Sequence, residues 1–206
     1  MRPIGEYLIN CGNKIKKKYW RTTHKFGIRL PKTVAEALRF DKENGNTYWA
    51  DAISKEMGKA KVSFNPMDGC TPEQVRANKV DELRGFQEIK CHIVFDVKMD
   101  FTRKARFVAG GHTTEAPNSL TYSCVVSRES VKIAFLIAAL NELDIMACDI
   151  GNAYLNAPCR EKIWFVAGPE CGPDTQGMVC KLVRALYGLK SSGAAWRAMF
   201  SAFIVN

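Results

Sequence analysis

The stretch "QEIKCHIVFDVKMDFTRKARFVAGG", residues 87–111, decides the fold class. Apolar side chains occupy every second position from Ile89 to Met99, and polar residues stand between them except at Val94. A period of two is typical of a half-buried antiparallel strand. "MDFTR" then predicts a hairpin turn, and "RKARFVAGG" predicts the returning strand. The sequence therefore predicts an antiparallel hairpin at this point of the chain.

Helical patterns flank this hairpin on both sides. Thr33 and Glu36 form a capping-box pattern before "TVAEALRFDKENG", which Gly45 ends, and a second helix is expected to follow Thr47. "IAFLIAAL" at 133–140 lies in a helix expected from about Glu129 to Asn141, which is apolar on most faces and is therefore predicted to be central. We also expect short strands at 162–166 and near 178–183, and a helix over 194–205. Helices and antiparallel hairpins intermix, which predicts an α+β fold.

The positive charge is concentrated at the N-terminus. Residues 1–32 hold nine Lys and Arg against Glu6 alone, whereas residues 33–206 hold 21 basic against 20 acidic side chains. We therefore predict a basic flexible arm over 1–32 and a folded body over 33–206. The arm has two open interpretations: it binds nucleic-acid phosphates through counterion release, with Tyr19 and Trp20 available to stack, or it is a solvated basic tail.

Cysteine spacing and hydropathy argue against a zinc site, a disulfide-bonded fold and a membrane span. None of the eight cysteines forms a C-x-x-C pair or lies beside a histidine at zinc-site spacing, and several fall in apolar runs. Such residues behave as small hydrophobes, so we expect reduced, buried thiols and an intracellular protein. No apolar run approaches the roughly 20 residues of a membrane span, so no membrane association is expected.

A candidate site lies in "CDIGNAYLNAP", residues 148–158. Asp149 follows an apolar run that is expected to be a strand, so its carboxylate would lie at the rim of a sheet. A hard cation such as Mg²⁺, which prefers oxygen ligands, would compensate that charge. Gly151 leaves the backbone bare for a phosphate or sugar, and Tyr154 would form an aromatic wall. The alternative is that Asp149 caps a short helix that begins at Ile150.

Four ordered segments resemble the reverse transcriptase of copia-type retrotransposons: "YWADAISKEM", "KARFVAGGHT", "DIGNAYLNAP" and "CKLVRALYGLKSSGAAW". The resemblance covers roughly residues 40–206. It implies the fingers and a partial palm of an RNA-directed DNA polymerase, which acts on an RNA template, a DNA primer and deoxynucleoside triphosphates with Mg²⁺. It also implies an upstream integrase in a polyprotein, and a place in a cytoplasmic virus-like particle or in the nucleus.

The resemblance also implies roles for individual residues. Asp149 matches the catalytic, metal-binding aspartate, and the Ile150 carbonyl adds an oxygen to the metal. Gly151, Asn152 and Ala153 match the stretch beside the triphosphate, and Tyr154 matches the aromatic gate that excludes a ribose 2′-hydroxyl. Lys104 and Arg106 lie where the family places basic groups on the triphosphate. Gly188, Leu189 and Lys190 match the turn that contacts the template.

Two departures from the family pattern affect these expectations. After Lys190 the family usually has Gln and then Ser-Pro, whereas this chain has Ser191, Ser192 and Gly193. The family's second metal motif, a Y-V-D-D-like hairpin, is absent, and no "DD" occurs in the sequence. Because two metal ions need carboxylates from both motifs, we predict that this chain is a fragment that is inactive alone. Two alternatives are a non-catalytic nucleic-acid-binding protein and an untranslated transposon relic.

Overall fold

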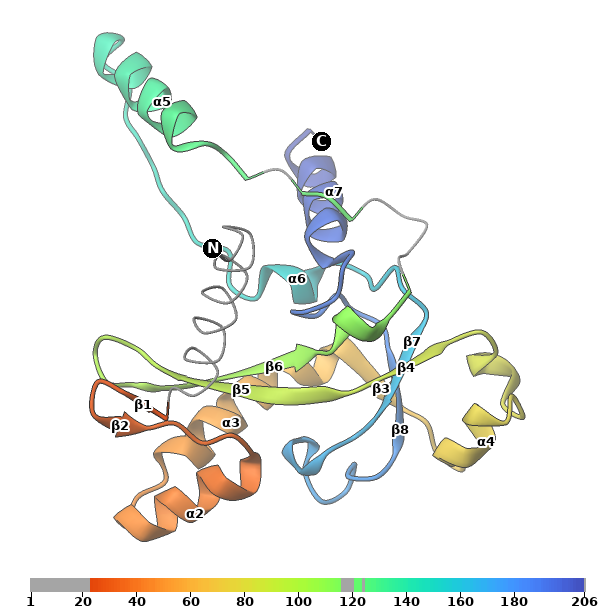
Figure 1. Cartoon of the computed structure of the whole chain (residues 1–206). Coiled ribbons are helices and arrows are strands. Elements are labelled where there is room, and N and C mark those ends of the chain that lie inside the picture. Colours follow the sequence, from red (N-terminus) through yellow and green to blue (C-terminus); the bar gives the residue numbers. More distant parts are fainter. Residues whose placement is uncertain (1–22, 116–120, 124, 206) are drawn as a thin grey trace, which may run out of the picture. The chain divides into compact units, whose positions relative to one another are not determined.

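The computed structural model describes residues 23–115, 121–123 and 125–205. They contain helices and strands in an α+β arrangement (Figure 1). The chain divides into two compact units: unit 1 holds the described residues up to Gly58 together with Ile93–Phe107, and unit 2 holds Lys59–His92 and the described residues from Val108 onward. No helix in these ranges is long and apolar enough to span a bilayer.

Unit 1 contains the two predicted helices, α2 (Val34–Asn44) and α3 (Tyr48–Ala60), although the last two residues of α3 belong to unit 2. The hydroxyl of Thr33 accepts the Glu36 N–H at 3.1 Å, and Gly45 ends α2 with a φ of 62°, as the capping pattern predicts. The reciprocal half of the capping box is not formed, because the Glu36 carboxylate accepts the N–H of Lys32 instead, at 2.8 Å. Helix α2 therefore begins and ends where the sequence predicts.

A buried carboxylate fixes the start of α3. Asp41 is 5% exposed and accepts the backbone N–H of Trp49 at 3.0 Å and that of Ala50 at 2.8 Å. These N–H groups lie in the first turn of α3, where no carbonyl of the helix itself can satisfy them. From there Trp49, Ile53 and Met57 are buried at helical spacing, as predicted. The Trp49 ring meets that of Phe95 edge to face, at 5.5 Å.

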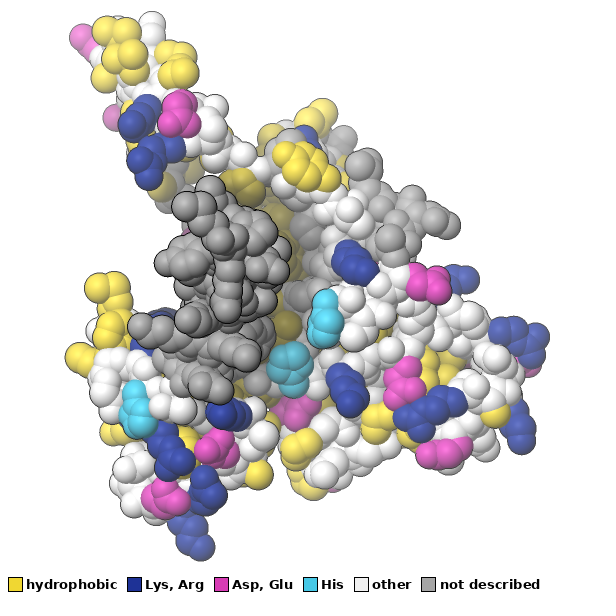
Figure 2. Space-filling model, in the orientation of Figure 1, with side chains coloured by type: hydrophobic (Ala, Val, Ile, Leu, Met, Phe, Trp, Pro, Cys, Tyr) yellow, Lys and Arg dark blue, Asp and Glu magenta, His cyan; other side chains and the backbone are white. Residues whose placement is uncertain are grey.

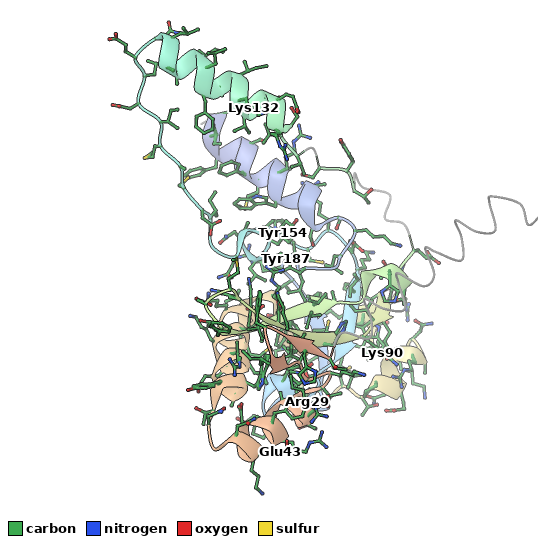
Figure 3. All side chains as sticks on the ribbon, turned by 60° about the vertical axis from the view of Figure 1, so that its left-hand side comes forward. Arg29, Glu43, Lys90, Lys132, Tyr154 and Tyr187 are labelled. Atoms are coloured by element: carbon green, nitrogen blue, oxygen red, sulfur yellow. The ribbon has the colours of Figure 1, made fainter. Side chains whose placement is uncertain are left out.

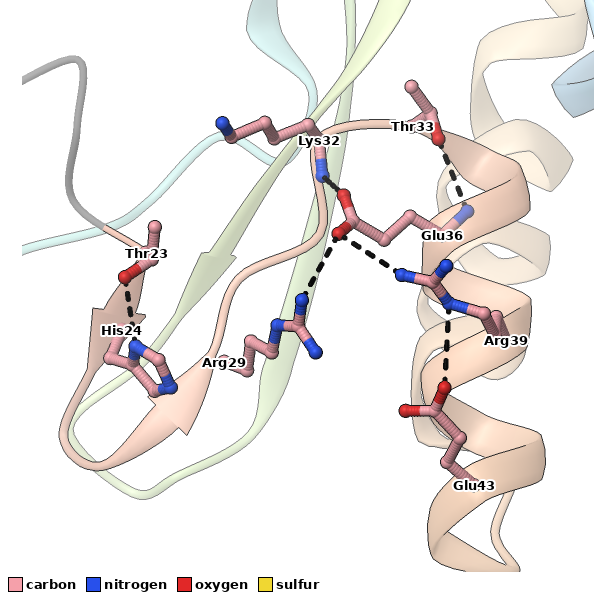
Figure 4. A network of polar contacts seen from close by, with 8 residues as sticks. All are labelled: Thr23, His24, Arg29, Lys32, Thr33, Glu36, Arg39 and Glu43. Atoms are coloured by element: carbon pink, nitrogen blue, oxygen red, sulfur yellow. Dashed lines mark hydrogen bonds and ion pairs between the residues drawn. The ribbon is translucent and has the colours of Figure 1, made fainter.

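Part of the predicted flexible arm is folded. Strands β1 (His24–Lys25) and β2 (Ile28–Arg29) form an antiparallel hairpin, so for residues 23–32 the flexible arm is replaced by structure, whereas residues 1–22 lie outside the described residues. The guanidinium of Arg29 lies 4.4 Å from the ring centre of Phe40 and 3.8 Å from the Glu36 carboxylate, which also lies 3.6 Å from Arg39 (Figure 4). The hairpin is therefore held to α2 by Arg29, a basic residue of the predicted arm.

Residues 87–111 form the predicted hairpin, with one interruption. The stretch is divided into β4 (Gln87–Ile89) and β5 (Cys91–Val97), and β5 pairs with β6 (Arg103–Ala109). The prediction of one continuous strand is wrong at Lys90, because its carbonyl accepts the N–H of Gly110 at 2.9 Å, whereas β4 joins a different sheet. The turn is closed by the Phe101 N–H, which donates to the Lys98 carbonyl at 3.0 Å.

Unit 2 is built on a four-stranded sheet in the order β3 (Phe64–Pro66), β8 (Val179–Leu182), β7 (Ile163–Val166) and β4. Strand β8 is antiparallel to both β3 and β7, whereas β4 is parallel to β7. The side chains of Trp164, Phe165 and Val179 are almost fully buried. The Phe165 ring meets that of Phe64 edge to face at 5.3 Å, so β7 and β3, the two neighbours of β8, contribute to one core.

The remaining elements of unit 2 are helices and 3₁₀ turns. Helix α4 (Pro72–Arg76) starts with a complete capping box between Thr71 and Gln74. The others are α5 (Arg128–Leu140), α6 (Ala153–Asn156), α7 (Ser192–Val205), and the 3₁₀ turns Lys61–Ser63, Asp81–Leu83, Gly111–Thr113 and Pro169–Cys171.

Helix α5 contradicts the prediction of a central helix. It forms where expected, with the Ser127 hydroxyl as its cap at 3.0 Å from the Ser130 nitrogen, but Ala138 is its single buried residue. Leu136 is 58% exposed and Leu140 is 74% exposed, and hydrophobic side chains are visible among charged ones on its surface in Figure 2. The sequence pattern shows that the helix is apolar, but it does not show which other element covers it. An apolar pattern alone therefore does not predict that the helix is buried.

Candidate nucleotide and nucleic-acid site

The segment that carries Asp149 is exposed and irregular. Residues 143–150 form no strand and are all exposed, so the predicted strand into Asp149 is wrong. A strand needs a partner edge, and none of the strands in the described ranges pairs with this segment. The Asp149 carboxylate makes no hydrogen bond or ion pair with any residue that the structure describes. Its oxygens are therefore available to a cation or to a donor from outside.

The capping alternative for Asp149 is also wrong. Helix α6 begins at Ala153, and the residue at its N-cap is Asn152, in the left-handed conformation with a φ of 54° and a ψ of 39°. Asparagine tolerates this conformation better than most residues do. Gly151 precedes it, and a Cβ added to that glycine would meet nothing within 4 Å. The backbone just beyond Asp149 is thus open, as the sequence suggests.

Tyr154 packs against an aromatic residue of another motif. Its ring centre lies 4.8 Å from that of Tyr187, with the planes tilted by 51°, and Figure 3 shows the two side chains next to each other. Tyr154 also lies against the small buried cluster of Ala157, Ala185 and Ala195. The contact brings the "GNAYLN" and "LYGLK" segments together within unit 2. No role was predicted for Tyr187 from the sequence, although it lies in the "CKLVRALYGLKSSGAAW" segment.

The turn at Gly188–Lys190 is held tightly by the end of β6. The Ala109 N–H donates to the Tyr187 carbonyl at 2.8 Å. Gly188 has a φ of 96°, and a Cβ there would lie 2.9 Å from the Cγ1 of Val108. Leu189 is buried, and the ammonium group of Lys190 donates to the carbonyl of Thr114. The turn therefore has a fixed shape, and Lys190 uses one of its three donors internally.

The two serines that depart from the family pattern have internal partners. Ser191 and Ser192 are each 1% exposed. The Glu161 carboxylate accepts both the Ser191 N–H at 2.9 Å and its hydroxyl at 2.7 Å, while the Ser192 hydroxyl donates to the Leu186 carbonyl at 2.7 Å. These contacts anchor the start of α7 to the turn. Glu161 was not identified from the sequence, because nothing in its local pattern marks it.

Lys104 and Arg106 belong to unit 1 and lie on β6. Ala105 between them and Phe107 after them are buried, so the alternation of the strand turns both cations toward its other face. The Phe107 N–H donates to the Glu56 carboxylate at 3.0 Å, which fixes this part of β6 to α3. The Asp96 carboxyl is partly buried, but hydrogen bonds from Lys25 and the Val97 N–H, with the nearby charge of Lys104, hold its pKa below the ordinary value.

Comparison with known proteins assigns the family. The family model described as reverse transcriptase (RNA-dependent DNA polymerase) matches residues 77–206. The chain belongs to this reverse transcriptase family. The match contains every candidate site residue, from Lys104 to Lys190, as well as the Tyr187 and Glu161 contacts.

The relatives are retrotransposon polyproteins of the copia type. The chain is 28% identical over 182 residues to the transposon Ty1-DR5 Gag-Pol polyprotein of Saccharomyces cerevisiae, a match that covers 87% of this chain and 10% of the relative. The Ty1-DR1 Gag-Pol polyprotein of the same yeast matches with the same values. The chain thus spans about a tenth of the length of these curated relatives. No solved structure matches it.

The described residues of this reverse transcriptase segment do not make up a divalent-metal site by themselves. No group of three or more His, Cys, Asp or Glu side chains with the geometry to hold an ion occurs within them. Asp149 is exposed, and Mg²⁺ binds weakly to a lone carboxylate because it gives up its waters reluctantly. The residues present therefore do not fit the expected pair of Mg²⁺ ions without additional acidic ligands.

The six cysteines in the described ranges are all free. Cys171 and Cys180 are buried, and burial is the main cause that raises the pKa of Cys171 to about 12 and that of Cys180 to about 11. At neutral pH these thiols are protonated and unreactive. Cys148, beside Asp149, is exposed, so the prediction of buried thiols does not extend to it.

Proposed function

We propose that this chain supplies the nucleotide-binding and template-contacting part of an RNA-directed DNA polymerase, which extends a DNA primer on an RNA template with deoxynucleoside triphosphates. The observation that carries the proposal is the contact of the Tyr154 and Tyr187 rings, with centres 4.8 Å apart. It joins the segment proposed to hold the nucleotide to the turn proposed to contact the template. In this proposal, unit 1 corresponds to fingers and unit 2 includes part of the palm.

The residues after Asp149 suit the approach of a nucleotide. Asp149 offers two carboxylate oxygens that no described residue uses, and the Ile150 carbonyl adds a third. Gly151, Asn152 and Ala153 would lie along the triphosphate, where the absence of a side chain at Gly151 allows close contact. Tyr154 would then face the sugar, and a 2′-hydroxyl would collide with its ring. Because Tyr187 packs on that ring, it would act as a positioning residue for the gate.

Basic groups would neutralise the phosphates. Lys104 and Arg106 project from the same face of β6, and we assign them to the triphosphate. Gly188, Leu189 and Lys190 form the turn assigned to the template. Lys190 retains two N–H donors beyond the one given to the Thr114 carbonyl, enough to bind a backbone phosphate.

The chemistry needs acidic groups that these 206 residues lack. Phosphoryl transfer by two Mg²⁺ ions supplies an activated primer hydroxyl and charge stabilisation, and both ions need carboxylates. Asp149 is one such ligand, and the sequence contains no adjacent aspartate pair. We expect no template-directed synthesis from this polypeptide alone.

A gain-of-function experiment tests the proposal. The continuation of a copia-type relative that carries the Y-V-D-D-like hairpin is fused after residue 206, and extension of a primer on RNA is measured with Mg²⁺. We expect extension that Asp149→Asn abolishes, while Gly58→Ala, remote in sequence and without steric consequence, leaves it intact. A folded, active fusion that is insensitive to Asp149→Asn would disprove the catalytic assignment.

Nucleic-acid binding without catalysis is the second candidate. The excess of basic residues in 1–32 favours it, because phosphate contacts need no catalytic aspartate. Binding of an RNA–DNA hybrid by the chain with Asp149→Asn, at the wild-type affinity, together with an inactive fusion would support this function alone. In either case we propose an intracellular site of action, in a virus-like particle or the nucleus, with an integrase encoded upstream in the same polyprotein.

A further inference from the structure

Two hairpin turns of unit 1 meet through exposed aromatic rings. Phe26 lies in the turn between β1 and β2, and Phe101 lies in the turn between β5 and β6. Their ring centres are 6.1 Å apart with an interplanar angle of 80°, yet Phe26 remains 51% exposed and Phe101 57% exposed. Met99, in the second turn, is 87% exposed. We call Phe26 and Phe101 the aromatic tip; the hairpins that carry it lie side by side in Figure 1.

Both rings are held in a conformation that phenylalanine rarely adopts. Phe26 has a φ of 52° and Phe101 a φ of 62°, in the left-handed region that favours glycine and asparagine. Turn formation alone would therefore select another residue at each position. Half-exposed rings also recover only part of the burial energy that would compensate the strain. Outliers of this kind, when they come in a pair, point to a role for the exposed ring faces.

Lys25 and Arg103 lie at the aromatic tip. The Lys25 ammonium lies 5.6 Å from the ring centre of Phe26, and the Arg103 guanidinium donates to the Phe101 carbonyl at 2.6 Å. Residues 23–32 and 96–106 together contain seven Lys and Arg against Asp96 and Asp100. The ion pair of Lys25 with Asp96, at 2.6 Å, ties the first hairpin to β5 and so fixes the distance between the rings.

We propose that the aromatic tip is a stacking platform for unpaired bases of single-stranded nucleic acid, with the surrounding cations on the phosphates. Exposed aromatic rings on a basic surface are the combination that binds single strands without sequence preference. An apolar protein partner would not require the excess of cations, and an anionic lipid surface would not require two rings held edge to face. The inference rests on the proposed function, because it assigns the single strand to the same protein that handles a template.

The test measures binding of the whole chain to two fluorescein-labelled oligonucleotides of equal length at a fixed salt concentration. One is unstructured RNA, and the other has the same backbone with abasic residues. We expect the wild-type chain to bind the RNA about tenfold more tightly than the abasic strand, since stacking contributes on the order of a factor of ten per base. Phe26→Leu and Phe101→Leu keep an apolar side chain but lose the π face, so they should remove this difference, whereas Phe101→Trp should retain it.

Control variants separate the loss of a ring from other effects of a substitution in the same turn. Met99→Leu changes an exposed apolar side chain in the same turn without removing a ring and should have no effect. Near-ultraviolet circular dichroism confirms that each variant is folded. Equal binding of RNA and abasic strands by the wild-type chain would overturn the inference while leaving the proposed function intact. Failure to bind either strand would overturn both. Tighter binding to anionic phosphatidylserine vesicles than to RNA, lost in the leucine variants, would assign the tip to a membrane surface instead.

Discussion

Gly111 and Leu189 approach so closely that a Cβ on Gly111 would lie 2.9 Å from the Leu189 Cα, and closer still to the Gly188 carbonyl oxygen. The neighbouring atoms are backbone, which cannot rotate away. The Gly111→Ala variant should therefore lose about 1–3 kcal/mol of unfolding free energy, as expected for overpacking. Urea denaturation of the whole chain measures the loss.

A glycine elsewhere in the chain provides the control. A Cβ on Gly58, in α3, would meet nothing within 4 Å. Gly58→Ala should stabilise the chain by about 0.5–1 kcal/mol, because alanine lowers the entropy of the unfolded chain and favours the helix. Equal stability of the Gly111→Ala and Gly58→Ala variants would contradict the close approach of Gly111 to the backbone of Gly188 and Leu189.

The second prediction concerns the cap of α3. Replacing Asp41 by alanine leaves the N–H groups of Trp49 and Ala50 buried without their acceptor, so we expect a loss of about 1–3 kcal/mol in thermal or urea unfolding. Asp51→Ala is the matched control, because Asp51 is exposed and its carboxylate accepts only the Thr47 hydroxyl, at 2.9 Å. Its cost should be smaller than that of Asp41→Ala. Equal costs would exclude the capping role.

The third prediction is a pH dependence that originates in the Arg76–Glu88 pair. The guanidinium donates two hydrogen bonds of 2.7 Å to the carboxylate, and these hold the pKa of Glu88 below its ordinary value of 4.5. A lowered carboxyl pKa contributes stability that is present above pH 4.5 and is lost as the pH falls through the lowered value. The unfolding free energy should therefore decrease on acidification below pH 4.5.

A double-mutant cycle isolates this pair. Glu88→Gln and Arg76→Gln should each reduce the acid dependence, and the double variant should reduce it no further than either single change. Because both side chains are substantially exposed, the effect should shrink in high salt. If the two substitutions changed the acid dependence additively, Glu88 and Arg76 would act independently, and their pairing would not be its cause.

Local patterns in the sequence predicted local structure well. The cap at Thr33, the end of α2 at Gly45 and the hairpin turn near Phe101 depend on residues close together in the chain, so their physical causes are visible in the sequence. The same reasoning failed for the 143–150 segment and for α5. Strand formation and helix burial both require a distant partner, and an apolar pattern does not specify one.

The candidate site could be predicted only in part. The motifs identified Asp149 and Tyr154 as candidates by resemblance, and their roles stay predictions. The Tyr154–Tyr187 contact and the Glu161–Ser191 hydrogen bonds each join residues about 30 positions apart. Such pairings follow from the tertiary fold, and no local signal reveals them. The capping role of Asp41 could not be predicted from local sequence either, because the N–H groups that it accepts lie in the next helix.

The last prediction concerns the basic N-terminal region. Residues 1–22 hold six Lys and Arg against Glu6, whereas residues 23–32 form the β1–β2 hairpin that packs on α2. Deleting 1–22 therefore tests phosphate binding while the β1–β2 hairpin stays in place, whereas deleting 1–32 would remove that hairpin. If the region neutralises phosphates, the slope of log affinity against log salt should flatten by up to about five, at roughly 0.7–0.9 per contact. An unchanged slope, with unchanged thermal stability, would mean that residues 1–22 contribute no phosphate contacts and that the hairpins or unit 2 carry the binding.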